Sequence, residues 1–155
     1  MADYEKIRSR LQARCVRREY CTEDIRRKAL DLFEGDGEAA RRVVASLLED
    51  RFVDDARYAR AFARDKAVFT GWGTEKIRLA LRAKKIPEEA IQEALDAIDV
   101  PSAADKLLRL LRTRDRSLAG DPSRRLKLLR YGVGRGYPYD EVSEAVTALL
   151  REGSA

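Results

Sequence analysis

The stretch from Phe52 to Leu95, FVDDARYARAFARDKAVFTGWGTEKIRLALRAKKIPEEAIQEAL, decides the fold because it predicts three short helices in succession. Asp54 is suited to begin the first helix, since its carboxylate can accept a hydrogen bond from a free amide of the first turn. Tyr58, Phe62 and Phe69 follow at helical spacing. We therefore expect these three aromatic side chains on one apolar side of the first helix.

Glycine, threonine and proline mark the boundaries between the three helices. Gly71 and Gly73 end the first helix and allow a sharp turn around Trp72. Thr74 is a candidate cap for the second helix. Pro87 suits the first turn of the third helix, because its fixed φ is helical and the missing N–H has no partner there. The stretch thus predicts a unit of three helices.

The composition of the whole chain favours an all-helical protein. Of its 155 residues, 45% are hydrophobic and 38% are charged, whereas about 25% of residues are charged in an average protein. Such a charge load suits short amphipathic helices with solvated faces. No apolar stretch is long enough for a transmembrane helix, and the N-terminal residues lack the apolar core of a signal peptide. We therefore expect a cytoplasmic protein with no membrane contact.

Segments of the central stretch recur elsewhere in the chain. The segment IPEEAIQEALDAI, from Ile86, matches YPYDEVSEAVTAL, from Tyr137, at a shift of 51, with apolar on apolar and acidic on acidic positions. The segment TEKIRLAL, from Thr74, resembles TEDIRRKAL, from Thr22, at a shift of 52 and SRRLKLLR, from Ser123, at a shift of 49. Recurrence at a nearly constant period is typical of helical repeat proteins.

We therefore predict an all-α fold of three tandem three-helix repeats that form an elongated, curved array. The predicted repeats cover residues 1–50, 51–100 and 101–155. Outside the central stretch, helices are expected near residues 4–18, 22–34, 38–49, 102–115, 122–131 and 138–151. The alternative is a generic helical bundle in which the similarity between segments is accidental.

The sequence contains none of the common catalytic constellations. Because the chain has no His, it cannot form Ser-His-Asp or Cys-His nucleophile systems or most zinc sites. It also lacks the glycine-rich phosphate-binding loop of nucleotide hydrolases. Cys15 and Cys21 are interpreted as ordinary reduced thiols, although a redox pair stays open. We expect no enzyme activity, no metal and no cofactor.

The C-terminal part of the chain carries an excess of positive charge. Between Lys106 and Arg135, ten Lys or Arg residues are opposed only by Asp115 and Asp121. Such a surface attracts phosphates or an acidic protein groove, whereas the simpler interpretation is a solvated helix face. We predict a basic face that binds a partner or DNA, formed by Arg64, Lys66, Lys76, Arg78, Arg82, Lys84, Arg109, Arg112, Arg116, Arg124, Lys127 and Arg130.

Two further expectations concern the arginines of this face and the nearby Trp72. Arg109, Arg112 and Arg116 recur at spacings of three and four, so they are expected to share one side of a helix. Trp72 is suited to stack on a base of single-stranded nucleic acid. The alternative is that its ring packs over the turn beside the second helix.

The central stretch resembles the RecX family, the bacterial regulators of the RecA recombinase. The matching residues are Phe52-Val53-Asp54-Asp55-Ala56-Arg57-Tyr58-Ala59, Phe62, Arg64, Lys66, Gly71-x-Gly73, Lys76-Ile77, Leu81, Lys84-Lys85-Ile86, Ile91 and Ala94-Leu95, with Lys127-Leu128 and Arg135-Gly136-Tyr137 in the last repeat. Lys85 departs from the pattern, because many members carry Gly after the second helix. A left-handed residue there costs Lys about 1 kcal/mol more than Gly, so a different closure of this turn stays open.

The resemblance implies a regulator without catalysis that binds in the groove of the RecA–single-stranded-DNA filament. There it would limit filament growth, ATP hydrolysis, strand exchange and coprotease activity, in recombination, DNA repair and the SOS response. We expect a monomer whose basic face is the contact surface. Asp54, Asp55, Arg57, Tyr58 and Trp72 are expected to form a structural joint between repeats. The alternatives are a helix-turn-helix protein that binds single- or double-stranded DNA directly, and a helical scaffold for an unrelated partner.

Overall fold

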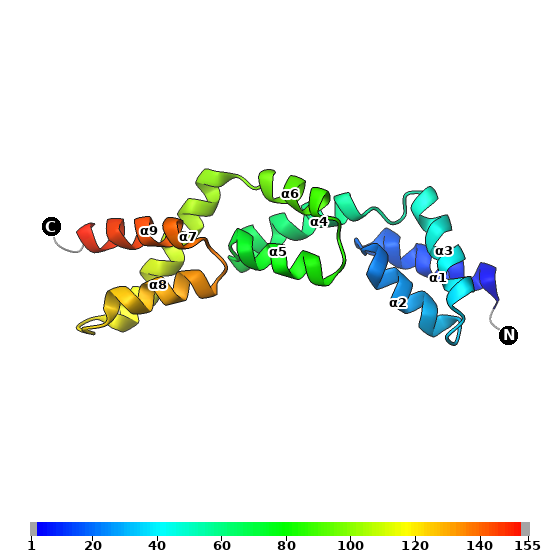
Figure 1. Cartoon of the computed structure of the whole chain (residues 1–155), viewed down its shortest axis with the longest axis horizontal. Coiled ribbons are helices and arrows are strands. Elements are labelled where there is room, and N and C mark those ends of the chain that lie inside the picture. The colour runs from blue at the N-terminus through cyan, green and yellow to red at the C-terminus, as the bar shows by residue number, and fades with distance from the viewer. Residues whose placement is uncertain (1–2, 153–155) are drawn as a thin grey trace. The chain divides into compact units, whose positions relative to one another are not determined.

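The computed structural model describes residues 3–152, and within this range every regular element is a helix (Figure 1). This confirms the predicted all-α class. The elements are α1 (Tyr4–Arg17), α2 (Thr22–Leu32), α3 (Gly37–Glu49), α4 (Asp55–Asp65), the π-helix η1 (Lys66–Thr70), α5 (Thr74–Ala83), α6 (Glu88–Asp96), α7 (Val100–Asp115), the 3₁₀-helix η2 (Arg116–Leu118), α8 (Arg124–Gly134) and α9 (Tyr139–Glu152). No helix in the described range is both long and apolar enough to cross a membrane.

The helix boundaries follow the capping residues of the sequence. The Asp36 carboxylate accepts hydrogen bonds from the amides of Glu38 and Ala39 at the start of α3. The Asp54 carboxylate likewise accepts from the Arg57 amide at 3.0 Å, as predicted. α6 begins at Glu88, directly after Pro87, so the proline precedes the first helical residue. The six helices predicted outside the central stretch lie within three residues of their expected ends.

The first helix of the central stretch ends differently from the prediction. After α4 the backbone widens into the π-helix η1, which closes at Gly71 with a left-handed φ of 72°. Phe69 in this segment is 78% exposed, whereas Tyr58 is buried. The expectation that Phe69 continues the apolar side of the helix was wrong. Hydrogen bonds from i to i+5 place more residues in each turn than an α-helix does, so Phe69 rotates away from that side.

The chain packs as two compact units. Unit 1 comprises Met1–Ala61 and Leu81–Glu93, and unit 2 comprises Phe62–Ala80 and Ala94–Ala155. The division passes through α4, α5 and α6, so the predicted middle repeat contributes residues to both units. The three repeat boundaries therefore stay a prediction, and residues 1–2 and 153–155 of the outer repeats lie outside the described range.

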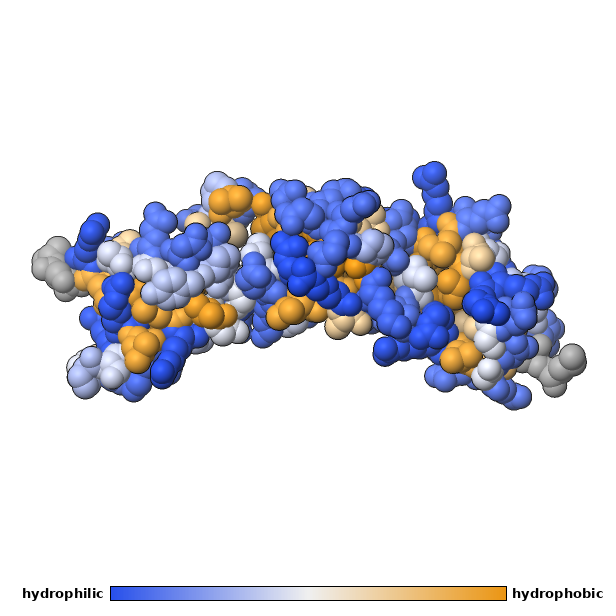
Figure 2. Space-filling model, viewed as in Figure 1, coloured by the Kyte–Doolittle hydropathy of each residue, from blue (hydrophilic) through white to orange (hydrophobic). Residues whose placement is uncertain are grey.

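Each unit has its own apolar core. In unit 1, α1, α2 and α3 bury Leu11, Ile25 and Leu47 completely. In unit 2, the fully buried side chains include Leu111 of α7 and Leu128 of α8. Burying a side chain of this size stabilises the fold by about 1.5–3 kcal/mol. Hydrophilic residues cover most of the face seen in Figure 2, with apolar patches left between them.

Two glycines allow a close backbone contact inside unit 2. The amides of Gly73 and Glu75 donate to the carbonyl oxygens of Arg135 and Gly136, at 2.9 and 2.8 Å. A Cβ on Gly73 would lie 2.2 Å from the carbonyl carbon of Gly136. The start of α5 is thereby fixed against the turn between α8 and α9, and only glycine fits there.

Candidate partner-binding surface

The predicted basic face is divided between the two units. Arg82 and Lys84 belong to unit 1. The other ten residues belong to unit 2: Arg64, Lys66, Lys76, Arg78, Arg109, Arg112, Arg116, Arg124, Lys127 and Arg130. We therefore describe the basic residues of unit 2 separately from those of unit 1.

The exposed side of α7 carries two of the three arginines that were expected to share a helix face. Arg109 and Arg112 are exposed, and Leu107 and Leu111 are buried on the other side of the helix. Arg112 donates to the Glu152 carboxylate at 3.1 Å. Arg116 is also exposed, but it begins the 3₁₀-helix η2 after α7 ends. The predicted row therefore leaves α-helical geometry at its last member.

Arg124 and Lys127, two residues of the predicted face on α8, are engaged by carboxylates of unit 2. The Arg124 guanidinium donates to both Asp115 oxygens, at 2.5 and 2.6 Å, and these hydrogen bonds lower the pKa of Asp115. The Lys127 ammonium donates to Asp121, which lowers the pKa of that carboxyl, and the Ser123 amide lowers it further. These contacts join α8 to the end of α7, at Asp115, and to the segment that follows it, at Asp121. They leave Arg124 and Lys127 less available to a partner than the sequence suggested.

The exposed cations without an ion pair among the described residues include Arg109, Arg116 and Arg130. Arg109 also lines a groove of about 460 Å³ together with Arg64, Lys106 and one carboxylate, that of Asp99. Lys106 was counted in the basic segment of the sequence but was not assigned to the face. Cations that converge on one groove attract a phosphate or a carboxylate more strongly than dispersed ones do.

Trp72 is held against a neighbouring ring and two ammonium groups. Its indole packs edge-on against Phe62, with ring centroids 6.2 Å apart. The ammonium groups of Lys66 and Lys76 lie 4.7 and 4.6 Å from the centre of its ring system. Cation–π contacts of this kind contribute about 0.5–1 kcal/mol at exposed sites. Trp72 is half-buried in unit 2, and Arg78 is half-buried on α5.

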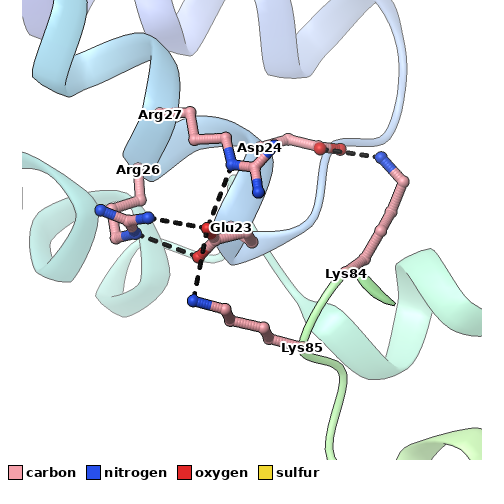
Figure 3. Close-up of polar contacts among 6 residues, drawn as sticks. All are labelled: Glu23, Asp24, Arg26, Arg27, Lys84 and Lys85. Carbon is pink, nitrogen blue, oxygen red and sulfur yellow. Dashed lines mark hydrogen bonds and ion pairs between the residues drawn. The ribbon is translucent and has the colours of Figure 1, made fainter. Parts of the chain in front are cut away.

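In unit 1, the turn between α5 and α6 is attached to the start of α2 by ion pairs (Figure 3). The Lys84 ammonium lies 2.8 Å from the Asp24 carboxylate, and that of Lys85 lies 3.7 Å from Glu23. Glu23 also accepts hydrogen bonds from Arg26 and Arg27. Its side chain is only 8% exposed, and the hydrogen bonds from Arg26 are the main cause that lowers its pKa to about 2.

Three of the residues that were predicted as a joint, Asp55, Arg57 and Tyr58, contact other parts of unit 1. The Asp55 carboxylate accepts from the Thr22 amide at 2.7 Å. Arg57 donates to Glu19 at 2.9 Å. Lys84 lies 5.9 Å from the centre of the Tyr58 ring. Asp55 and Arg57 thus contact positions 19–24, whereas Asp54 caps its own helix. Trp72 belongs to unit 2 and makes its contacts there.

Lys85 takes the left-handed backbone conformation that Gly adopts with less strain. Its φ is +59°, so the turn closes through a left-handed residue even though Lys stands there. The pair with Glu23 lies directly at this strained position. Arg82 pairs with Glu88 across the same turn. Sequence reasoning missed Glu23 and Asp24 as partners, since acidic residues in a first helical turn are already explained by the helix dipole.

The described residues contain no cluster of three or more His, Cys, Asp or Glu side chains that is arranged to hold a metal ion. Cys15 and Cys21 are buried free thiols. Burial raises the pKa of both, to about 11 for Cys21. Neither thiol therefore has the low pKa of a reactive cysteine.

Comparison with known proteins identifies a consistent set of relatives. A family model described as "RecX, second three-helix domain" matches residues 54–95. Regulatory protein RecX of Thermus thermophilus is 32% identical over 118 residues, which cover 76% of this chain and 75% of that protein. Regulatory protein RecX of Clostridium botulinum is 31% identical over 139 residues, which cover 87% of this chain and 65% of that protein. The match thus spans about two thirds of the clostridial protein's length.

Two solved structures share the fold. "Crystal structure of regulatory protein RecX" superposes with a TM-score of 0.83 at 23% identity, covering 94% of this chain and 71% of that one. "Crystal structure of RecX from Lactobacillus salivarius" superposes with a TM-score of 0.81 at 16% identity, covering 94% and 96%. At these identities the likeness concerns the fold alone.

Proposed function

The chain belongs to the RecX family, and from this premise we propose that it is a non-enzymatic regulator that binds the RecA–single-stranded-DNA filament. Binding limits filament extension and, with it, ATP hydrolysis, strand exchange and coprotease activity. The protein acts in the cytoplasm, as a monomer, in recombination, DNA repair and the SOS response.

The relationship in sequence carries this proposal. It extends over three quarters or more of the chain in relatives that are named regulatory proteins. The basic surface of unit 2 adds a physical reason. Arg109, Arg116 and Arg130 present charge to solvent, and a nucleoprotein filament offers both phosphates and acidic protein surface. We therefore assign filament contact to unit 2.

The direct test measures ATP hydrolysis by a bacterial RecA on circular single-stranded DNA while this protein is added in substoichiometric amounts. Hydrolysis is expected to fall, because a regulator that limits extension acts on many RecA subunits through each bound copy. Filament length, measured by electron microscopy, is expected to shorten in parallel. Unchanged hydrolysis together with unchanged length contradicts the proposal.

Direct DNA binding is the second candidate, because α5 and α6 are joined by four residues, 84–87, as in a helix-turn-helix. The composition of α6 disfavours it. A recognition helix lies among phosphates, but α6 carries Glu88, Glu89, Glu93 and Asp96 and no Lys or Arg. This candidate predicts steeply salt-dependent binding of duplex DNA by the isolated protein. Failure to bind any duplex at low salt eliminates it.

A further inference from the structure

Unit 2 contains a second groove, which is lined by apolar and acidic residues instead of basic ones. It has a volume of about 450 Å³ and lies among α7, α9 and the turn that carries Trp72. Its lining is mostly apolar and includes Ile98, Ala104 and Ala148. Val100, at its border, is 75% exposed. Small side chains on two neighbouring helices leave room for another helix to approach closely.

Three carboxylates, and no Lys or Arg, line this groove: Asp105, Glu141 and Glu144. Within residues 3–152, no ion pair joins any of the three to a basic side chain. Burial raises the pKa of Glu141, and the neighbouring charges of Asp140, Glu144 and Glu75 raise it further. Among the described residues, the negative charge of these three carboxylates is therefore not neutralised by an ion pair.

The combination of apolar surface and unneutralised carboxylates restricts what can bind there. A nucleic acid is repelled, because its phosphates would face Glu141 and Glu144. An uncharged apolar ligand would bury these carboxylates without compensation, which is costly. An amphipathic helix satisfies both features, since Leu-like side chains can fill the groove while Lys or Arg side chains reach the carboxylates.

We propose that this groove is a docking site for an amphipathic helix of a partner protein that carries Lys or Arg residues beside an apolar stripe. The groove is separate from the filament-binding surface that we assign to Arg109 and Arg116. An assembly that presents such a helix beside the filament could therefore hold this protein at two sites at once. Two weak sites that are occupied together bind more tightly than either site alone.

The only Trp of the chain, Trp72, lines the groove and provides the readout. The probe is a synthetic peptide of about 14 Leu and Lys residues with helical periodicity, a length of about 21 Å. A second peptide has Gln in place of Lys, because an acidic peptide would itself be attracted to Lys66 and Lys76 beside Trp72. Because the protein itself has a net charge of +5, non-specific attraction to the Lys peptide is small. We expect a saturable change in Trp72 emission with the Lys peptide at about 50 mM salt, and none with the Gln peptide.

Paired variants assign the effect to the groove. Glu141→Gln with Glu144→Gln is expected to weaken the Lys peptide about tenfold, and Ala104→Phe is expected to abolish binding by filling the groove. Asp31→Asn with Glu49→Gln removes the same charge from exposed positions of unit 1 and is expected to change nothing. Circular dichroism confirms that each variant is folded.

Three results overturn the proposal. The first is the absence of saturable binding up to about 1 mM peptide. The second is equal binding of the Lys and Gln peptides, or equal binding of the Lys peptide by the groove and control variants. The third is a concentration-dependent dimer in sedimentation that Ala104→Phe abolishes, because this result assigns the groove to a second copy of the chain. None of these results depends on whether the protein binds RecA.

Discussion

The amide of Gly73 donates a hydrogen bond to the carbonyl oxygen of Arg135 at 2.9 Å. This contact brings two backbone segments together so closely that no Cβ fits at Gly73, where it would meet Gly136 and Tyr137 at 2.2 Å. Both glycine positions belong to the sequence pattern that first indicated the family. Glycine stands at Gly73 in this pattern because the packing of two backbone segments inside unit 2 leaves no room for a side chain.

Gly73→Ala is expected to destabilise the protein by at least about 2 kcal/mol, because the clash is with backbone atoms that cannot rotate away. Urea unfolding monitored by circular dichroism measures the change. Gly134→Ala is the matched control, since Gly134 ends α8 with nothing within 4 Å of an added Cβ. The control is expected to be neutral or to stabilise by up to about 1 kcal/mol. Equal effects of the two substitutions would contradict the packing argument.

Lys85→Gly is expected to stabilise the protein by about 0.5 kcal/mol. Gly relieves the left-handed φ of +59°, which is worth about 1 kcal/mol. It also removes the pair with Glu23, but the Lys85 side chain is 69% exposed, and an exposed pair contributes little. Lys85→Ala keeps the strain and loses the pair, so it is expected to destabilise slightly. A clear loss of stability for Lys85→Gly would show that the pair outweighs the strain.

Glu23 is expected to give the protein a specific sensitivity to acid. Its pKa of about 2 in the fold lies below the ordinary value of 4.5. The stability that the carboxylate contributes is therefore present above about pH 4.5 and is lost as the pH falls toward 2. Glu23→Gln is expected to lower the free energy of unfolding by about 2 kcal/mol at pH 7. The variant and the wild type should converge as the pH falls from 4.5 toward 2, and a constant difference over that range would be inconsistent with this role.

The helices could be predicted from the sequence because capping and amphipathic spacing are local. Asp54 and Asp36 begin helices by bonding amides two or three residues away. The π-helix η1 was not predictable by the same reasoning, since the spacing of Tyr58, Phe62 and Phe69 fits a continuous α-helix. Its wider turn was visible only in the structure.

The sequence predicts which residues of the candidate surface are basic, but it does not predict which of them are free to contact a partner. The sequence shows that Arg124 and Arg109 are basic, but not that Asp115 engages Arg124 while Arg109 stays exposed. Long-range pairs were equally hidden, since Asp24 and Lys84 lie 60 positions apart. Such pairs depend on how the helices pack, and helical periodicity carries no information about that.

Cys15 and Cys21 are expected to react slowly with a thiol reagent such as DTNB at pH 8. Both thiols are buried, and burial raises the pKa of Cys21 to about 11, so little thiolate forms. We expect both thiols to react at once in guanidinium chloride and about 100-fold more slowly in the folded protein. Fast reaction of either thiol in the folded protein would indicate the open redox alternative.

The central claim is that the exposed arginines of unit 2 bind the RecA–DNA filament, and one comparison of ATP hydrolysis tests it most directly. RecA on single-stranded DNA is titrated with the wild type, with Arg109→Glu/Arg116→Glu, and with the control Lys6→Glu/Arg10→Glu, which reverses equal charge on exposed positions of α1. We predict inhibition by the wild type and the control, and at least about tenfold weaker inhibition by the unit 2 variant. Equal inhibition by all three proteins, or a loss confined to the α1 variant, would contradict the account.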